Sequence, residues 1–269
     1  MPTAVVVGYG YAGRKHAEAL QRLGYTVIPV DSRRVDGLPP DALPELLESS
    51  SVELVVFACT PRAREEYLQS LRKQLEEKLV VLEKPPVRPA SWRMLASLGL
   101  DWVPVHNYLY MPTVRKAMAE GTVEAIVLRP GPHRGWYTSV DDAGGGILLD
   151  HGYHWLYVAS ELDGISLETA WIDTFPETEA AFATRRVRFY GSWRSPFRAT
   201  ILNHKPFEPR SSEMLASLER FYVSVLRGEE ERARLRSQAL EALSTIELVY
   251  EKSGLPWRGR EGRSDEPNT

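Results

Sequence analysis

The stretch Ala4-Val5-Val6-Val7-Gly8-Tyr9-Gly10-Tyr11-Ala12-Gly13 decides the fold of this chain. Its first four residues form a short, continuous apolar run, which is typical of a strand covered on both faces of a parallel sheet. The next six residues fit the spacing Gly-x-Gly-x-x-Gly, and a helical pattern begins at Tyr11. A glycine fingerprint between a strand and a helix is typical of the first turn of a βαβ unit that binds a dinucleotide.

Each glycine of the fingerprint has a physical task. Gly8 makes the tight turn, Gly10 lets a pyrophosphate approach the backbone, and Gly13 permits close packing of the helix on the strand. The start of the helix adds unpaired N–H groups and a positive dipole end, and both favour an anion. We therefore expect the pyrophosphate to lie against Gly8, Tyr9, Gly10, Tyr11, Ala12 and Gly13.

An acidic residue, Asp31, ends the second predicted strand, 18 residues after Gly13. An acidic side chain at this place accepts hydrogen bonds from both hydroxyls of an adenosine ribose, which favours NAD. Ser32, Arg33 and Arg34 follow at once, and an arginine pair can hold the 2′-phosphate of NADP. Both cofactors stay open, with NAD slightly favoured, and Asp31 as a simple turn residue is the alternative.

Residues 3–106 alternate short apolar runs with longer helix-like segments, which predicts βαβ units around a doubly wound parallel sheet of the Rossmann type. The predicted strands are 4–7, 26–30, 54–58, 79–82 and 102–105. The predicted crossover helices are 11–23, 41–48, 62–76 and 91–98. We expect an α/β dinucleotide-binding domain over residues 1–106.

The pattern changes beyond residue 107. We expect helices at 114–120, from 144 to about 161, at 213–226 and at 233–251, and strands at 123–128, 169–175, 180–190 and 198–203. The period-2 alternation of the later strands predicts a half-exposed antiparallel sheet. Residues 107–257 are thus expected to form a smaller α+β domain with an open, mostly antiparallel sheet, followed by a disordered tail at 258–269.

Composition excludes several function classes. The formal net charge of −3, without a long block of one sign, argues against nucleic acid as a partner. No apolar stretch approaches the length of a membrane span and no export signal is visible, so we expect no membrane partner. Cys59 is the only cysteine, which rules out an internal disulfide and a thiolate zinc site and favours a reducing, cytoplasmic setting. No metal site is expected.

Two further motifs carry candidate chemistry. Lys84, in Glu83-Lys84-Pro85, follows the fourth predicted strand, where ligands of doubly wound sheets bind. Asp150 and His154 lie in GGGILLDHGYH at 144–154 and share a face if this stretch is helical. A histidine near neutral pKa suits general acid/base work. The alternatives are an exposed strand end for Lys84, and a simple helix pair beside a glycine hinge for Asp150 and His154.

These motifs, together with Cys59-Thr60-Pro61 after the third predicted strand, resemble the Gfo/Idh/MocA oxidoreductases, the glucose-fructose oxidoreductase and inositol dehydrogenase-like family. The resemblance extends through 105–112 and 233–254, so it covers nearly the whole chain. It implies a Rossmann domain plus an α/β domain with an open sheet, NAD or NADP as cofactor, and hydride exchange with a sugar, polyol or related carbonyl compound. It also makes a homodimer plausible.

Site roles follow from the resemblance by motif. Lys84 resembles the lysine that contacts substrate and nicotinamide ribose, Asp150 the substrate-binding aspartate and His154 the acid/base histidine. The implied mechanism has His154 take the hydroxyl proton as hydride leaves, Lys84 stabilise the alkoxide, and Asp150 fix the substrate and the imidazole. The cofactor side would include Cys59, Thr60, Pro61 and Glu83, and the substrate side would add His106, Asn107, Trp136 and Tyr137.

Some features depart from the family pattern or have ordinary explanations. The segment Tyr108-Leu109-Tyr110-Met111-Pro112 lacks the arginine common in the family, which leaves the substrate open. A dinucleotide-binding regulatory protein and an NAD-dependent glycoside hydrolase are therefore alternatives. His16 and His204 are expected at the surface, and His151 is expected to point about 100° away from Asp150 on a helix. His106 and Asn107 face the cofactor or, slightly favoured, cap the next helix.

Overall fold

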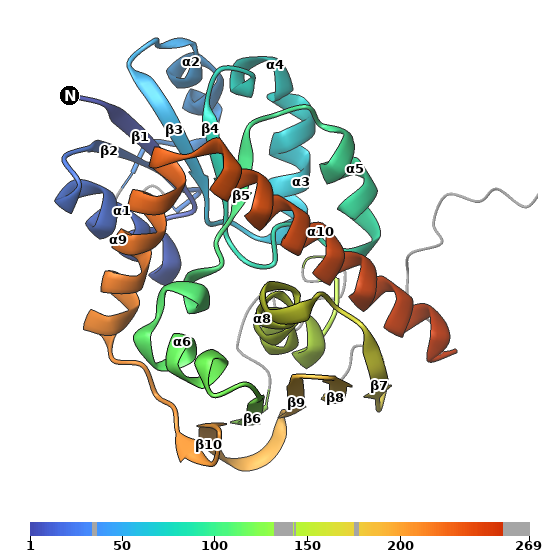
Figure 1. The fold of residues 1–269 in the computed structure, drawn as a ribbon. Coiled ribbons are helices and arrows are strands. Elements are labelled where there is room, and N and C mark those ends of the chain that lie inside the picture. Colours follow the sequence, from blue (N-terminus) through green and yellow to red (C-terminus); the bar gives the residue numbers. More distant parts are fainter. Residues whose placement is uncertain (34–36, 132–141, 143, 175–177, 255–269) are drawn as a thin grey trace, which may run out of the picture.

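A computed structural model describes residues 1–33, 37–131, 142, 144–174 and 178–254. Two sheets form its framework, and Figure 1 shows them joined by helices from both halves of the chain. Trp136, Tyr137 and Arg34 lie outside the described residues, as does the predicted tail at 258–269.

The first sheet is parallel throughout and has the order β2-β1-β3-β4-β5. Its strands are β1 (Thr3–Val7), β2 (Thr26–Val30), β3 (Val52–Phe57), β4 (Leu79–Leu82) and β5 (Trp102–Pro104). The strand order reverses between β1 and β3, and ligands of such sheets bind outside the carboxyl ends of the strands at this switch point. The expected doubly wound sheet is thus confirmed.

Helices cover both faces of this sheet, because β1, β3, β4 and β5 are mostly buried apolar runs that need cover on each side (Figure 1). They are α1 (Tyr11–Arg22), α2 (Leu43–Glu48), α3 (Pro61–Ser70), α4 (Arg72–Leu75) and α5 (Trp92–Ser97). Short 3-10 turns occur at Pro40–Ala42, Pro89–Ser91 and Asn107–Tyr110. The single helix predicted at 62–76 is wrong, since Leu71 separates α3 from α4 with a non-helical backbone.

The second sheet has the order β11-β10-β6-β9-β8-β7, and only its β6–β9 pair is parallel. Its strands are β6 (Val123–Pro130), β7 (Leu167–Ile172), β8 (Glu179–Thr184), β9 (Val187–Ser192), β10 (Arg194–Leu202) and β11 (Lys205–Pro206). The expected mostly antiparallel sheet is confirmed. The single strand predicted at 180–190 is wrong, because the Thr184 hydroxyl accepts the Val187 N–H at 3.0 Å and closes a turn there.

The remaining helices connect the two sheets. They are α6 (Pro112–Ala119), α8 (Tyr153–Asp163), which follows a π-helical turn at Leu148–Gly152, α9 (Ser211–Arg227) and α10 (Glu229–Lys252). Although α9 and α10 come last in the chain, α9 packs on α1, and α10 runs from β5 to α8 (Figure 1). In the part of the chain that the structure describes, no helix is long and apolar enough to cross a membrane.

Candidate active site

The glycine turn is packed against the end of β3 so closely that two positions accept only glycine. Gly8 has a φ of +90°, and a Cβ there would lie 2.7 Å from the backbone nitrogen of Cys59. A Cβ on Gly13 would lie 2.0 Å from the carbonyl oxygen of Gly8. The turn therefore sits at the switch point between β1 and β3, where the sequence places the dinucleotide.

The outer side of the same turn is open. Among the described residues, a Cβ built on Gly10 would have only the Arg33 guanidinium within 4 Å, at 3.8 Å. Helix α1 begins at Tyr11 without a side-chain cap on its first N–H groups. An open glycine in front of an uncapped helix start leaves room and hydrogen-bond donors for an anion, so this cradle fits a pyrophosphate. Ala12 lies in the first turn of α1.

Asp31 directly follows β2 and connects the cradle to the next turn through hydrogen bonds. Its carboxylate accepts the Tyr9 N–H at 2.7 Å and the Arg33 N–H at 2.8 Å, and the Arg33 Nε lies 3.3 Å away. Partial burial alone would raise the pKa of Asp31, but these hydrogen bonds and the Arg33 charge outweigh it and lower the pKa. Ser32 is exposed between Asp31 and Arg33. Asp31 is thus ionised beside the expected adenosine ribose.

Cys59, Thr60 and Pro61 form the junction between β3 and α3. The Thr60 hydroxyl caps α3 by accepting the Ala63 N–H at 3.3 Å, and Pro61 is the first helical residue. Burial raises the pKa of the Cys59 thiol despite the nearby Arg64 charge, so the thiol is neutral. This junction lies directly beside Gly8.

Lys84 and Asp150 meet across 66 residues of sequence. Lys84 follows β4, and its Nζ donates to Asp150 Oδ1 at 2.9 Å and to the Asp150 carbonyl oxygen at 3.0 Å. The Asp150 side chain is buried, whereas that of Lys84 keeps 18% of its surface exposed. A buried carboxylate thus holds an ammonium group that solvent or a ligand can still reach.

His151 joins this pair, contrary to expectation. Its Nε2 lies 3.3 Å from Asp150 Oδ2, within a π-helical turn at residues 148–152. Single π turns inside helices are frequent at functional sites. Asp150 therefore has Lys84 on one side and His151 on the other.

His154 lies one turn further on, nearly buried, and its ring is held by aromatic neighbours. Nδ1 lies 2.7 Å from the Tyr157 hydroxyl, and the ring stacks on Tyr108 with centroids 4.0 Å apart. The imidazole is thus oriented by Tyr157, not by Asp150 as expected. Burial lowers the pKa of His154 well below its usual value, and the charges of Lys84 and His151 lower it further against the opposing effect of Asp150. The ring is neutral.

His106 and Asn107 do not cap the following turn. The His106 ring is fully buried between Gln238, at 3.4 Å from Nδ1, and the Tyr153 hydroxyl, at 2.9 Å from Nε2. Burial, with a contribution from the Arg234 charge against the Gln238 hydrogen bond, lowers the pKa of His106 to about 3. The Asn107 amide points to the Met214 sulfur, 3.9 Å away.

A second group of residues supports Lys84 and was not found from the sequence. His16 is buried, contrary to expectation, and its ring lies between the Glu83 carboxylate, at 3.0 Å, and the Tyr222 hydroxyl, at 2.6 Å. The other carboxylate oxygen of Glu83 accepts the Lys84 N–H at 2.8 Å. His204 is at the surface as expected, with 87% of its side chain exposed.

Arg64 of α3 holds the loop at residues 83–86, which contains Lys84. Its buried guanidinium donates to the carbonyl oxygens of Glu83, Pro85 and Pro86, the last at 2.8 Å, and to that of Cys59 at 2.7 Å. No short motif reveals this role of Arg64.

Tyr157 was also missed, although its spacing of three residues from His154 on one helix predicts that the two side chains are neighbours.

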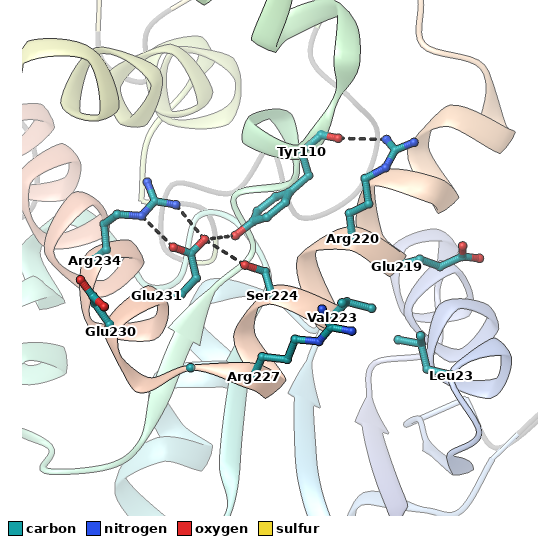
Figure 2. Close-up of a pocket in the computed structure, with 11 residues that line it drawn as sticks. Leu23, Tyr110, Glu219, Arg220, Val223, Ser224, Arg227, Glu230, Glu231 and Arg234 are labelled. Atoms are coloured by element: carbon teal, nitrogen blue, oxygen red, sulfur yellow. Dashed lines mark hydrogen bonds and ion pairs between the residues drawn. The ribbon is translucent and has the colours of Figure 1, made fainter.

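A pocket of about 790 Å³ lies apart from this group, between α9, the start of α10 and the turn at Asn107–Tyr110 (Figure 2). Glu231 occupies its wall and accepts hydrogen bonds from the Tyr110 hydroxyl, from Ser224 at 3.3 Å and from Arg234 at 2.8 Å. Lys84, Asp150 and His154 do not line it. Its central carboxylate is thus already satisfied by protein donors.

Comparisons with known proteins establish the fold. No protein-family model and no curated protein matches the sequence. Among solved structures, GenD2 from gentamicin A biosynthesis, in complex with NAD, is 19% identical, covers 94% of both chains and has a TM-score of 0.73. The WlbA dehydrogenase from Thermus thermophilus, with NAD and α-ketoglutarate, is 16% identical over 95% of this chain and 96% of its own (TM-score 0.72). KijD10, a 3-ketoreductase from Actinomadura kijaniata with NADP and TDP-benzene, is 18% identical over 93% and 97% (TM-score 0.70). The chain shares the fold of these three proteins over nearly its whole length.

Proposed function

We propose that this protein is an NAD(P)-dependent oxidoreductase that transfers hydride between a nicotinamide cofactor and a sugar, polyol or related carbonyl or hydroxyl compound. One observation carries the proposal: the Lys84–Asp150 ion pair joins the end of β4, two strands from the glycine cradle, to the turn that leads into His154. This brings a cation, a carboxylate and a neutral imidazole to the edge of the sheet where ligands of this fold bind. The resemblance to the Gfo/Idh/MocA oxidoreductases supports the same reaction.

The cofactor proposal rests on the shape of the cradle. Gly8 and Gly13 close the turn and Gly10 leaves its outer side open, so the pyrophosphate would lie at the start of α1. When bound, a nicotinamide dinucleotide supplies or accepts the hydride. GenD2 and WlbA were crystallised with NAD and KijD10 with NADP. Asp31 favours NAD slightly, and the guanidinium of Arg33 beside Gly10 keeps NADP as the second candidate.

The proposed chemistry assigns one task to each side chain. The Lys84 ammonium stabilises the negative charge that develops on the substrate oxygen. Asp150, held within 2.9 Å, keeps that ammonium in place. His154 contributes a ring nitrogen to the same oxygen. WlbA was also crystallised with UDP-GlcNAcA, which places sugar nucleotides among the first compounds to test.

A titration with NADH and, separately, NADPH tests the proposal, followed by energy transfer from the seven tryptophans. We expect saturable binding at micromolar concentrations. Lys84→Met should abolish turnover and leave the dinucleotide affinity within a few fold, whereas Lys73→Met, on exposed α4, should change neither. Absence of binding by the folded protein would contradict the oxidoreductase proposal. Turnover of a glycoside without net change in nicotinamide absorbance would favour the hydrolase alternative instead.

We also propose that the protein is a cytoplasmic homodimer that pairs through the open face of the second sheet. The register places Trp171, Ala181, Tyr190, Ile126 and Ile201 in one row across β7, β8, β9, β6 and β10. Trp171 and Tyr190 keep 49% and 37% of their surface exposed. Exposed apolar patches of this kind mark protein–protein contacts.

A further inference from the structure

Three buried histidines of this protein share one arrangement: a ring nitrogen of each lies against the hydroxyl of a fully buried tyrosine. The pairs are His16 with Tyr222 at 2.6 Å, His106 with Tyr153 at 2.9 Å, and His154 with Tyr157 at 2.7 Å. A hydroxyl both donates and accepts, so each distance alone leaves the direction of the hydrogen bond open. The group on the other side of the ring settles it for two pairs, and the neighbours of the tyrosine hydroxyl settle it for the third.

In the first two pairs the tyrosine donates to the neutral form of the ring. The second nitrogen of His16 faces the Glu83 carboxylate, which only accepts, so in the neutral ring that nitrogen carries the proton and Nδ1 accepts from Tyr222. In the same way, the Gln238 amide nitrogen donates to Glu161 at 2.5 Å, which turns the amide oxygen toward Nδ1 of His106. Nδ1 of His106 therefore donates to that oxygen, and Nε2 accepts from Tyr153.

The third pair follows the same rule for a different reason. The Tyr157 oxygen already accepts the Tyr108 N–H at 3.4 Å, and within the described part of the chain Nδ1 of His154 is the one acceptor bonded to its hydroxyl hydrogen. If Nδ1 carried the proton instead, a fully buried hydroxyl hydrogen would have no acceptor, which is strongly unfavourable. Nδ1 of His154 therefore accepts, and the proton of this neutral ring is on Nε2.

The three histidines differ at the ring nitrogen that is not bonded to the tyrosine, here called the outward nitrogen. His16 donates outward to Glu83 and His106 donates outward to Gln238, whereas no hydrogen bond links Nε2 of His154 to any described residue. We infer that a substrate carbonyl oxygen takes this place, so that His154 is a hydrogen-bond donor to the substrate and Tyr157 is the residue that positions it. The inference rests on the proposed function and removes His154 as the proton acceptor, since a protonated Nε2 cannot accept a hydroxyl proton.

The donor assignment leaves the proton transfer in carbonyl reduction to Lys84. A bound reduced nicotinamide would supply the hydride to the carbonyl carbon, and the electron pair of the C=O π bond would move onto the oxygen, next to the His154 N–H and the Lys84 ammonium. The Lys84 ammonium gives its proton to this oxygen and completes the alcohol. The resulting amine regains a proton from solvent, which reaches the partly exposed Lys84. His154 keeps its own proton throughout. If the ring lost it, Tyr157 would have to supply a proton to Nδ1, and burial raises the pKa of the Tyr157 hydroxyl so that it remains protonated.

Long-range ¹H–¹⁵N correlation spectra of the full-length protein with ¹⁵N-labelled histidine test the inference at neutral pH. His154→Gln identifies the resonances of His154 by their loss. We expect a protonated Nε2 and an unprotonated, hydrogen-bonded Nδ1 in the wild type. Tyr157→Phe should shift the Nδ1 resonance toward that of a free imine nitrogen. Tyr222→Phe, the matched control, should shift the resonances of His16 and leave those of His154 in place.

Two outcomes would overturn the inference: a proton on Nδ1 of His154 in the wild type, or His154 resonances that are unchanged in folded Tyr157→Phe. The measurement requires neither cofactor nor substrate, so it is independent of the nicotinamide titration. Failure of that titration would overturn the proposed oxidoreductase function, whereas a proton on Nδ1 would overturn only the donor role of His154.

Discussion

Gly10 and Gly13 belong to one turn but have different surroundings. Substitution of Gly13 should therefore affect stability, whereas substitution of Gly10 should affect dinucleotide binding. A Cβ on Gly13 meets a backbone oxygen at 2.0 Å, so Gly13→Ala should lower the free energy of unfolding by about 1–3 kcal/mol. The nearest atom to a Cβ on Gly10 lies at 3.8 Å on a flexible side chain, so Gly10→Ala should fold normally. The added methyl group would occupy the space of the pyrophosphate, and we expect at least a tenfold loss of NADH affinity.

Urea denaturation and fluorescence titration of both glycine variants check this prediction. Wild-type affinity in Gly10→Ala would show that the pyrophosphate does not lie on this turn. Wild-type stability in Gly13→Ala would show that the turn is packed less closely against α1 than the structure indicates.

The buried histidines predict how stability depends on pH. Burial lowers the pKa of His106 from 6.5 to about 3 and lowers that of His154 as well. Between these values the unfolded chain binds protons that the folded chain does not, so stability is full above pH 6.5 and falls as the pH falls. Each such histidine contributes a slope of up to about 1.4 kcal/mol per pH unit.

We therefore expect the free energy of unfolding to fall between pH 6.5 and 4.5, and His106→Gln to reduce this slope. The exposed His204 provides the control, since His204→Gln should leave the slope unchanged. Urea denaturation at several pH values measures both. Asp31 and Glu83 have lowered pKa values and lose most of their stabilising contribution below pH 4.5, and this loss is shared by the wild type and both variants. Equal slopes in the wild type and His106→Gln would contradict the prediction.

At the scale of elements, helix α3 holds the loop that carries Lys84. Arg64→Met would leave four carbonyl oxygens, two of them buried, without this donor, and we expect a loss on the order of 3 kcal/mol in the free energy of unfolding. Arg64→Lys should recover part of it, because an ammonium keeps the charge but lacks the planar fork. Arg62→Met on the same helix removes an exposed ion pair with Glu66 and should change stability by less than about 0.5 kcal/mol. Urea denaturation compares the three, and equal losses for Arg64→Met and Arg62→Met would contradict the assignment.

The elements that the sequence predicted well are those whose pattern follows from local burial. Five continuous apolar runs gave the first sheet within two residues at each end, because both faces of such strands are covered. The turn between β8 and β9 was missed because Thr184, Arg185 and Arg186 mark it without glycine, asparagine or proline. The π turn at Leu148–Gly152 was missed because one extra residue in a helical turn leaves the apolar pattern nearly unchanged.

At the scale of the whole molecule, the errors come from contacts between distant segments. His16 was expected at the surface because nothing near it in the sequence covers it, yet α9 brings Tyr222 to its ring from 206 residues away. Lys84, Asp150 and His154 could be selected as candidates by motif and spacing. Their support by Glu83, His16 and Arg64, and the orientation of His154 by Tyr157, depend on tertiary packing that one sequence does not encode locally.

The open face of the second sheet gives the prediction that concerns the assembled molecule. A row that contains Trp171, Tyr190 and two isoleucines lies in register across five strands, and burying it against its symmetry copy would remove a large apolar area from water. Sedimentation equilibrium should therefore give a species of twice the 30.4 kDa chain mass. Tyr190→Arg should shift it to monomer, because a charge in the middle of the row would be desolvated without a partner. Leu248→Arg, at an exposed position on α10, should leave the dimer intact. A wild-type monomer at micromolar concentration would show that this face is not a self-association surface.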